Sequence, residues 1–246
     1  MNKEFAKKIV DILDKECSGK LSYNVEFGYD STEDSLNDGV QWDIERALRK
    51  NNIEDFFFAS GASKFVIVLE EEDFVIKIPY DGEYYWNYEE EDINYEPFHG
   101  ANSYTKVESE WNYCEVERVL YKKAKLAGVG QFFSGVVKIG EVEGRPIYAQ
   151  EIATTYGEGG TSGREASEYA KNSFPSVSSK IYTDCNFNAP EDWLCAAIDI
   201  YGMDAINKLS QFIHDNQIAD LHYENIGFSK DGLPVIMDYS SYNENE

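Results

Sequence analysis

The sequence predicts an α+β fold, and three kinds of pattern support that prediction. Apolar residues recur at helical spacing in several segments, strand-like apolar runs follow one another in the middle of the chain, and an Asp-Gly turn joins two short strands near its end. With 246 residues, of which 42% are hydrophobic and 15% aromatic, the chain can bury the core of one large domain or of two lobes.

The chain is strongly acidic, with a formal net charge of −24 at pH 7. Contacts to nucleic-acid phosphates need a basic surface, so we expect no direct nucleic-acid binding. A solvated acidic surface is the favoured explanation of the charge. The alternatives are an acidic decoy that mimics nucleic acid and a face for a basic partner.

The cysteines and histidines indicate neither a zinc site nor a disulfide framework. No two of the cysteines form a CxxC pair, and few histidines could assist them (Cys17, Cys114, Cys185 and Cys195; His99, His214 and His222). A reducing cytoplasm is therefore the expected compartment. No segment has the apolar length of a signal peptide or of a membrane span, so we expect no membrane association.

Two amphipathic helices are predicted in the first part of the chain, over residues 2–16 and 37–51. Each has one apolar stripe (Phe5, Ile9, Ile12 and Leu13; Val40, Ile44 and Leu48). Residues 23–34 between them are assigned as extended. Residues 1–52 carry no recognisable chemistry, and we expect the stripes to pack on a neighbouring lobe rather than to bind a partner.

Residues 56–79 predict three strands. Two apolar runs within 56–69 are joined by small residues around Gly61, which allow backbone amides to approach a phosphate closely. An acidic turn at 70–73 leads into the third run, Phe74-Val75-Ile76-Lys77-Ile78-Pro79. A lone lysine in such a strand either lies on a solvated face or is held inward by a charge partner.

A further helix is predicted over residues 108–127, with one apolar stripe (Tyr113, Val116, Leu120 and Ala124). Glu117 has apolar or aromatic neighbours at helical spacing, as expected on the buried side, whereas Glu115 has basic neighbours at the equivalent steps. We rank Glu117 first and Glu115 second as a buried acid. Surface charge is the alternative for both.

An insertion at 81–105 precedes this helix and is crowded with aromatic and acidic residues (Tyr84, Tyr85, Trp86, Tyr88, Tyr95 and Phe98; Glu89, Glu90, Glu91 and Asp92). So long a loop is unusual in a compact domain unless it is functional or mobile. The insertion is either a local cover for its lobe, which is the favoured interpretation, or a platform for a substrate or partner.

The second half of the chain predicts one more sheet segment and two helices. A hairpin is expected over 135–152 around Glu143-Gly144, and a stretch rich in Gly and Ser at 154–179 marks a domain boundary. Helices follow at 189–200 and 203–216.

Residues 220–240 carry the candidate chemistry. A strand at 225–228, a reversal at 229–232 and a return strand at 234–237 form a hairpin that folds Asp238 back beside Asn225. Oxygen donors of this kind suit a hard cation such as Mg²⁺ that carries a phosphate, and Asp220, one loop away, is available to accept a proton from a hydroxyl. The alternative is structural, with Asp220 and Asn225 as turn formers and Asp238 as a strand cap.

The spacing of Asp220, Asn225 and Asp238 resembles the catalytic loop and metal-binding Asp of the protein-kinase-like superfamily. The stretch Asp220-Leu221-His222 followed by Asn225 is also similar to the DLHxxN of aminoglycoside and choline phosphotransferases. A glycine turn, Val-Ile-Lys, a helix Glu and a hinge strand precede this motif in the same order, within residues 56–240. The chain most resembles abbreviated kinase-like proteins of bacteria and phages.

This resemblance implies a two-lobed kinase-like fold. An N-terminal helical extension covers 1–52, an N-lobe with an antiparallel sheet and one helix covers 53–153, including the 81–105 insertion, and a minimal, mostly helical C-lobe covers 154–246.

The resemblance also implies ATP and Mg²⁺ as cofactors. The nucleotide would be bound by Lys77 on the α- and β-phosphates, with Glu117 holding Lys77, by the turn residues Gly61, Ser63 and Lys64, by Gln150 in the gatekeeper position, and by the backbone of Glu151 and Ile152 at the adenine. Asn225 and Asp238 would bind Mg²⁺, and Asp220 would orient or deprotonate the acceptor hydroxyl.

Several positions depart from the pattern of that superfamily. Only Gly61 remains of three glycines, Ile218-Ala219 stands where the families have His-Arg or His-Gly, and Tyr239-Ser240 replaces Phe-Gly. The sequence ends eight residues after Asp238, so neither an activation segment nor an acceptor platform is expected.

The sequence therefore predicts an ATP- and Mg²⁺-dependent phosphotransferase whose acceptor, a hydroxyl on a protein or a small molecule, is unknown. The alternative is a catalytically silent kinase-like module that binds a nucleotide or, as an acidic phage-type protein, occupies a host partner.

Overall fold

The computed structural model describes residues 2–21, 24–26, 38–61, 64–80, 82–87, 92–97, 112–156, 189–218, 221 and 223–240. The chain divides into two compact units, each described here by itself. Unit 1 comprises Met1–Gly100, Glu110–Glu115 and Val136–Gln150, and unit 2 comprises Ala101–Ser109, Val116–Gly135 and Glu151–Glu246. Helices and strands are mixed in both, so the fold is α+β, as predicted.

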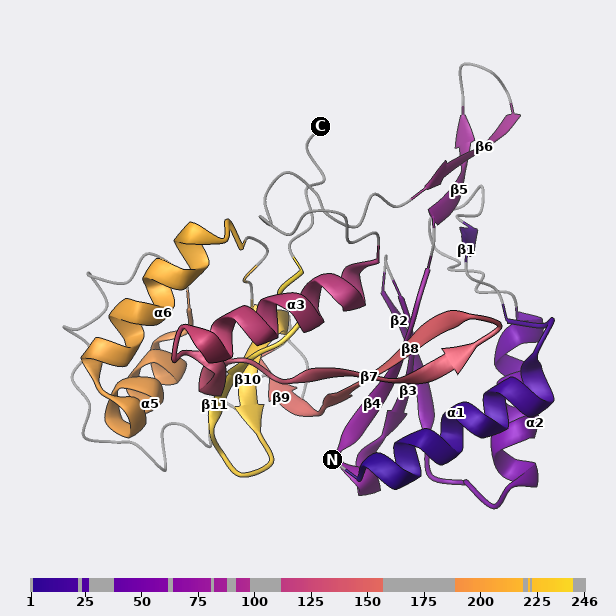
Figure 1. Ribbon diagram of the computed structural model, residues 1–246, viewed down its shortest axis with the longest axis horizontal. Helices are drawn as coiled ribbons and strands as arrows, with labels where there is room; N and C mark the ends of the chain where they lie inside the picture. The colour runs from indigo at the N-terminus through magenta and orange to yellow at the C-terminus, as the bar shows by residue number, and fades with distance from the viewer. Residues whose placement is uncertain are drawn as a thin grey trace. The chain divides into compact units, whose positions relative to one another are not determined.

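Unit 1 is built on a five-stranded antiparallel sheet with the order β2-β3-β4-β8-β7 (Figure 1). Its strands are β2 (Phe57–Gly61), β3 (Lys64–Leu69), β4 (Phe74–Pro79), β7 (Val136–Val142) and β8 (Arg145–Glu151). A 3₁₀ turn, η1 (Glu70–Glu72), joins β3 to β4. Glu143 and Gly144 join β7 to β8 with φ values of 54° and 77°, the left-handed pair that a two-residue hairpin turn requires. The predicted turn at Glu143-Gly144 is confirmed.

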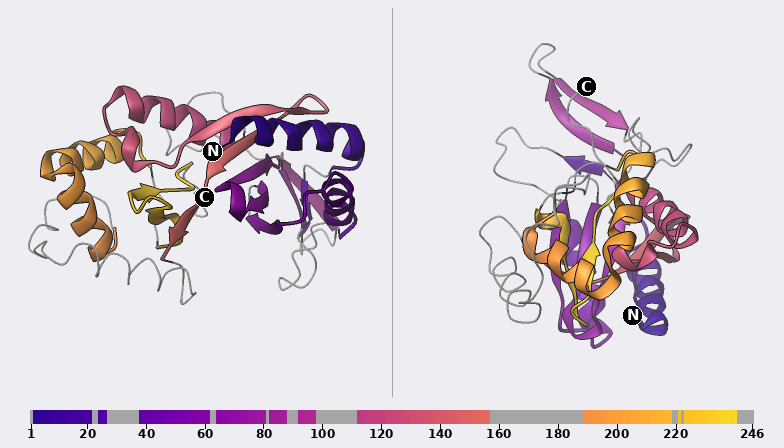
Figure 2. Two further views of the ribbon diagram at one scale, coloured as in Figure 1. Left: turned by 90° about the horizontal axis from the view of Figure 1, so that it is seen from below. Right: turned by 90° about the vertical axis from the view of Figure 1, so that its left-hand side faces the viewer.

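Two helices, α1 (Lys3–Cys17) and α2 (Asp38–Lys50), lie side by side in unit 1 (Figures 1 and 2). The Phe5 ring of α1 packs edge-on against Phe74 of β4, with centroids 6.3 Å apart. A Cβ added to Gly140 of β7 would collide with Val10 of α1, so helix and strand meet closely there. The apolar stripe of the first helix is therefore used for packing within the unit, as expected.

A separate three-stranded sheet, ordered β1-β5-β6, also belongs to unit 1. It contains β1 (Asn24–Glu26), β5 (Gly82–Asn87) and β6 (Asp92–Pro97). β1 runs parallel to β5, and β5 pairs with β6 as an antiparallel hairpin. The described part of the 81–105 insertion is thus a β-ribbon, and it is joined by a strand from the 23–34 segment that was assigned as extended.

Unit 2 contains the helices α5 (Glu191–Tyr201) and α6 (Met203–Asp215), separated by Gly202. Its sheet has the order β11-β10-β9, with β9 (Ala153–Thr155), β10 (Ile226–Ser229) and β11 (Pro234–Ile236). The indole Nε1 of the fully buried Trp193 donates to the Gly227 carbonyl at 2.9 Å, which joins α5 to this sheet. Residues 154 and 155, assigned to a linker, are in a strand because their backbone pairs with β10.

Helix α3 (Tyr113–Leu126) begins in unit 1 and continues in unit 2. The Asn112 side chain accepts a hydrogen bond from the Glu115 amide at 2.8 Å and so caps the helix. This helix lies within the predicted range 108–127, of which 108–111 fall outside the described residues. No helix in the described part of the chain is both long and apolar enough to cross a membrane.

Candidate functional site

In unit 2, the β10–β11 hairpin brings Asn225 and Asp238 to the same end of the sheet. Ile226 pairs with Ile236, so the next residues outward, Asn225 and Met237, lie opposite each other. The Met237 amide donates to the Asn225 carbonyl at 2.7 Å, and Asp238 follows directly. The predicted hairpin is confirmed, including its reversal through the Asp-Gly turn.

Asp238 has an unusual backbone conformation. Its φ is 46°, in the left-handed region that costs a non-glycine residue on the order of 1 kcal/mol. The residues around it hold this conformation. The Ile236 carbonyl accepts from the Ser134 amide at 2.9 Å, and the buried Tyr239 hydroxyl donates to the Ser134 carbonyl at 2.9 Å. Asp238 is thus fixed by buried contacts on both sides.

Asp238 and Asn225 carry a carboxylate and an amide at this end of the sheet. Asn225 is buried and Asp238 is half-buried. Among the described residues, no group of three or more His, Cys, Asp or Glu side chains is arranged to hold a metal ion. One carboxylate and one amide suit Mg²⁺ that takes its remaining ligands from phosphates and water, which is how this ion is commonly bound.

In unit 1, two lysines share one face of the five-stranded sheet. Val66 pairs with Lys77 and Lys64 pairs with Pro79, so the two lysines are diagonal neighbours on adjacent strands. This face is opposite the one that carries Phe74 against α1, because side chains alternate along a strand. Lys64 is 7% exposed and Lys77 is 3% exposed. The solvated-face alternative for Lys77 is therefore wrong.

The same face carries Tyr148 and Gln150 of β8. Gly140, which faces α1, pairs with Ile147, so the alternate residues Tyr148 and Gln150 lie on the side of the lysines. Both are buried. This face therefore combines two ammonium groups, an amide and a phenol, and buried groups of this kind need charged or hydrogen-bonding partners.

Tyr148 connects the sheet to the start of α3. Its hydroxyl donates to Glu115 Oε2 at 2.7 Å and accepts from the Asn112 amide nitrogen at 3.4 Å. Burial raises the pKa of Tyr148 well above its ordinary value, and Glu115 acts in the same direction, so the phenol stays protonated and remains a donor.

The two glutamates of α3 are in different environments. Glu115, ranked second from the sequence, is partly exposed and bound to Tyr148, whereas Glu117 is 0% exposed. The prediction that Glu117 lies on the buried side of the helix is confirmed. Its role as the partner of Lys77 stays a prediction.

The remaining predicted nucleotide-binding positions flank these elements. Gly61 ends β2 and pairs with Lys64 across the turn, and Ser63 lies outside the described residues. Gln150 is the last residue of unit 1 before the chain enters unit 2 at Glu151. Glu151 is exposed and Ile152 is half-buried.

Two residues of the predicted catalytic loop, Asp220 and His222, also lie outside the described residues. The structure thus brings together Asn225 with Asp238 in unit 2, and Lys64, Lys77 and Gln150 on one sheet face in unit 1.

Sequence reasoning missed the residues that support these two groups. Ser134 and Tyr239 fix the backbone around Asp238, and Asn112 and Tyr148 join α3 to the sheet. An aromatic residue directly after Asp238 and a tyrosine within an apolar strand were the available signals, since a buried tyrosine hydroxyl usually finds a hydrogen-bond partner. In comparisons with protein-family models and with curated proteins, no family model and no curated protein matches this chain.

Proposed function

We propose that the chain is an ATP- and Mg²⁺-dependent phosphotransferase that acts on a hydroxyl of a protein or a small molecule. The observation that carries the proposal is the burial of Lys77, 3% exposed, within β4. β4 is the third strand of the five-stranded sheet in chain order, and protein kinases bind the nucleotide phosphates with a lysine of their third strand. A lysine is almost never fully buried unless a partner compensates its charge.

Unit 2 supports the proposal independently. Asp238 adopts a left-handed backbone that its neighbours hold in place, and strained residues of this kind cluster at active sites. Asp238 follows directly on Met237, whose amide donates to the carbonyl of the buried Asn225, and a carboxylate and an amide oxygen at one end of a hairpin suit a phosphate-bound Mg²⁺.

The chemistry follows from these roles. Bound Mg²⁺ would neutralise charge on the β- and γ-phosphate oxygens. The Lys77 ammonium would bind and orient the phosphates. Asp220, assigned from its spacing, would take the proton of the acceptor hydroxyl as that oxygen bonds to the γ-phosphorus. The bond from this phosphorus to the bridging oxygen then breaks and ADP leaves.

The test measures Mg²⁺-ATP binding by calorimetry and turnover with labelled ATP. Lys77→Met should weaken binding between about tenfold and a hundredfold, because a hydrogen bond to a charged group is lost. Lys208→Met is its control, since Lys208 is exposed on α6. Asp238→Asn should remove the Mg²⁺ dependence, whereas Asp231→Asn, in the exposed turn of the same hairpin, should not.

Asp238→Gly separates function from folding. Glycine adopts a φ of 46° without strain, so this variant removes the carboxylate without adding backbone strain and should lose Mg²⁺-dependent binding while it still folds cooperatively. Equal ATP binding and turnover in the parent, Lys77→Met and Asp238→Asn would end the proposal. Binding that needs both residues but gives no turnover would support the catalytically silent nucleotide-binding alternative instead.

A further inference from the structure

Helix α2 of unit 1 carries a tryptophan on its outward face. The helix packs through an apolar stripe whose members are all buried (Val40, Ile44, Ala47 and Leu48). At 3.6 residues per turn, Trp42 lies on the opposite side of the helix from the centre of this stripe, and it is 68% exposed. A tryptophan in that position contributes little to the packing of its own unit. Tryptophan is enriched at the energetic centres of protein interfaces.

Three charged residues share this side of the helix with the tryptophan. Glu45, Arg46 and Arg49 follow Trp42 at three, four and seven residues, which is the spacing of a stripe that meets another helix. Both arginines are exposed and Glu45 is half-buried. These four residues are called the α2 face below. Arginine, like tryptophan, is enriched among the residues that dominate binding energy at interfaces.

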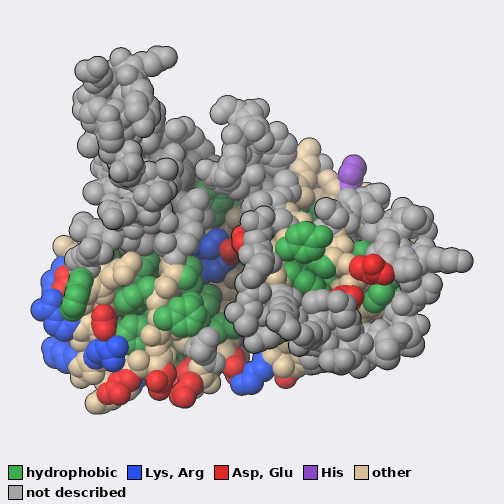
Figure 3. All heavy atoms as spheres, turned by 180° about the vertical axis from the view of Figure 1, so that it is seen from behind, with side chains coloured by type: hydrophobic (Ala, Val, Ile, Leu, Met, Phe, Trp, Pro, Cys, Tyr) green, Lys and Arg blue, Asp and Glu red, His purple; other side chains and the backbone are tan. Residues whose placement is uncertain are grey.

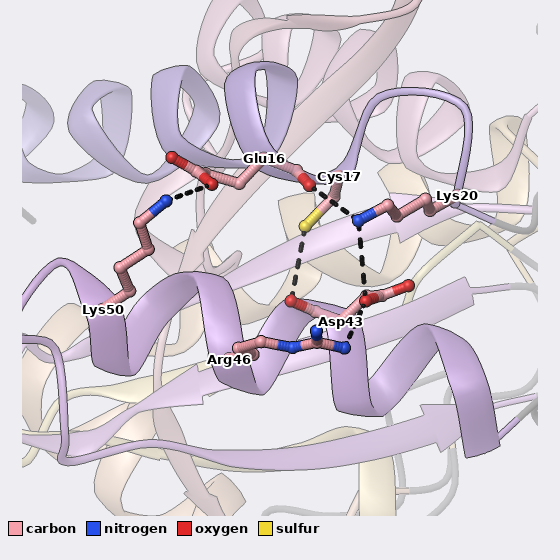
Figure 4. Close-up of polar contacts among 6 residues, drawn as sticks. All are labelled: Glu16, Cys17, Lys20, Asp43, Arg46 and Lys50. Carbon is pink, nitrogen blue, oxygen red and sulfur yellow. Dashed lines mark hydrogen bonds and ion pairs between the residues drawn. The ribbon is translucent and has the colours of Figure 1, made fainter.

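Contacts within the chain hold both arginines of the α2 face in place. Arg46 pairs with Asp43 at 2.9 Å (Figure 4), and Arg49 pairs with Glu45 at 2.8 Å. The Arg49 guanidinium also lies over the Phe56 ring, 5.5 Å from its centroid. Side chains that are already ordered lose less conformational entropy when a partner binds. The α2 face is therefore prepared for an interface.

The α2 face is complementary to a second copy of itself. When two α2 helices lie antiparallel and cross between Glu45 and Arg46, Trp42 of each copy is opposite Arg49 of the other, and Glu45 is opposite Arg46. Each of these pairings occurs twice, as in the interface of a two-fold dimer. A planar guanidinium can stack on an aromatic ring on each of its faces. Arg49 would then lie between Phe56 of its own chain and Trp42 of the second copy.

The charge of α2 also favours a second copy over a strongly charged partner. The helix contains three acidic and three basic residues, so it has no net charge in a chain of −24. The neighbouring α1 likewise carries four lysines and four acidic residues. Two copies that meet at α2 therefore keep most of their negative charge away from the contact, where salt screens it beyond a Debye length of about 8 Å.

We propose that α2 forms the interface of a two-fold homodimer, in which the α2 faces of two copies pack antiparallel. The helix has 13 residues and is about 20 Å long, so its face buries less than the roughly 800 Å² per partner of a standard interface. The dimer is therefore weak, with a Kd on the order of 10–100 µM. This proposal does not depend on phosphoryl transfer.

Sedimentation equilibrium of the full chain between about 1 and about 500 µM tests the proposal, since this range spans the expected Kd. Trp42→Ala should weaken association at least about tenfold, because two contacts between Trp42 and Arg49 are lost in each dimer. Leu126→Ala is its control, since Leu126 is an apolar residue of α3 that is 91% exposed and lies in unit 2. It should associate as the parent does. Both variants should unfold at the temperature of the parent at low protein concentration, because the altered side chains are exposed.

Charge reversal tests the antiparallel register. Glu45→Arg would place an arginine opposite Arg46 of the second copy, and Arg46→Glu would place a glutamate opposite Glu45. Each variant alone should therefore associate at least about tenfold more weakly than the parent. When the two variants are mixed, positions 45 and 46 of the mixed dimer again join opposite charges. The mixture should associate about as tightly as the parent.

Glu141→Arg and Lys138→Glu are the controls, because they make the same changes of net charge at an exposed ion pair of β7. Each should associate as the parent does, alone or mixed. A parent that stays monomeric over the whole range would overturn the proposal and would leave the α2 face to a different partner. A dimer that Trp42→Ala leaves intact would also overturn it, as would Glu45→Arg and Arg46→Glu variants that do not associate on mixing.

Discussion

The Cys17 thiol, at the end of α1, shows how burial controls one ionisable group. Figure 4 shows it between α1 and α2, where its Sγ lies 3.6 Å from the Asp43 carbonyl. Ion pairs surround it, including Glu16 with Lys50 at 2.7 Å and Asp43 with Arg46 at 2.9 Å. Burial, with a smaller contribution from the Asp43 carboxylate, raises the pKa of Cys17 to about 11. The thiol is therefore neutral at pH 7 and should react slowly with alkylating reagents.

This shift predicts a loss of stability at alkaline pH. In the unfolded chain the thiol ionises near its ordinary pKa of about 8.5–9, whereas the folded chain keeps the proton until about pH 11. Between these values the unfolded state binds fewer protons, so the free energy of unfolding falls as pH rises. We expect Cys17 to account for a loss on the order of 2–3 kcal/mol between pH 8 and pH 11.

Urea denaturation of the parent and of Cys17→Ala at pH 7.5, 9 and 10.5 measures this loss. The other ionisable groups titrate equally in both proteins, so the difference between their free energies of unfolding gives the contribution of the Cys17 thiol. The parent should lose more stability than the variant. Parallel curves for the two proteins would contradict the assignment.

At the scale of elements, the approach of β9 to β10 depends on Gly227. A Cβ at this position would collide with the backbone of Thr154, which a rotamer change cannot relieve. Gly227→Ala should therefore lower the free energy of unfolding by more than about 2 kcal/mol. It should also weaken Mg²⁺-ATP binding, because β10 positions Asn225.

Gly202→Ala is the matched control for this substitution in urea denaturation. Gly202 has a φ of 82° and a ψ of 161°, a backbone region that essentially only glycine adopts, and nothing lies within 4 Å of an added Cβ. The cost of Gly202→Ala is therefore conformational, about 1–3 kcal/mol. A smaller loss for Gly227→Ala than for Gly202→Ala would show that β9 moves aside at little cost.

Local chemistry explains which elements could be predicted from the sequence. Apolar stripes indicated the helices, and Glu143-Gly144 and Asp231-Gly232 indicated two hairpins, because these signals act within a few residues. β9 and the parallel pairing of β1 with β5 were not predicted, since they join segments far apart in the chain.

In the candidate site, too, short-range contacts could be predicted from the sequence and long-range contacts could not. The proximity of Asn225 and Asp238 was predictable because one short hairpin sets it. The hydrogen bond from Tyr239 to Ser134 spans 105 residues, and no local pattern indicates it. Helical spacing was enough to rank Glu117 above Glu115 as the buried glutamate of α3, whereas the hydrogen bond of Glu115 to Tyr148 depends on tertiary packing and had no local signal.

For the whole molecule, the dominant property is its charge of −24. On the face drawn in Figure 3, acidic and basic side chains lie close together along the lower edge, so part of the negative charge is compensated locally. The excess still opposes the compact state through self-repulsion, and salt screens that repulsion. Raising NaCl from 20 to 300 mM should therefore raise the unfolding midpoint, by about 2–4 °C for each kcal/mol of repulsion removed.

This screening also determines how Mg²⁺ should be tested. A divalent cation screens surface charge whether or not it has a binding site. A rise in the unfolding midpoint with MgCl₂ at low salt is therefore no evidence that Asn225 and Asp238 bind the ion. In 300 mM NaCl the Debye length falls to roughly 6 Å, so NaCl already screens most of the surface repulsion and added MgCl₂ screens little more. A rise in the unfolding midpoint on adding Mg²⁺-ATP in 300 mM NaCl therefore reports specific binding. This rise should be absent in Asp238→Asn and present in Asp231→Asn, which has the same net charge. If both variants keep the response, Mg²⁺-ATP binds somewhere other than the Asn225 and Asp238 pair.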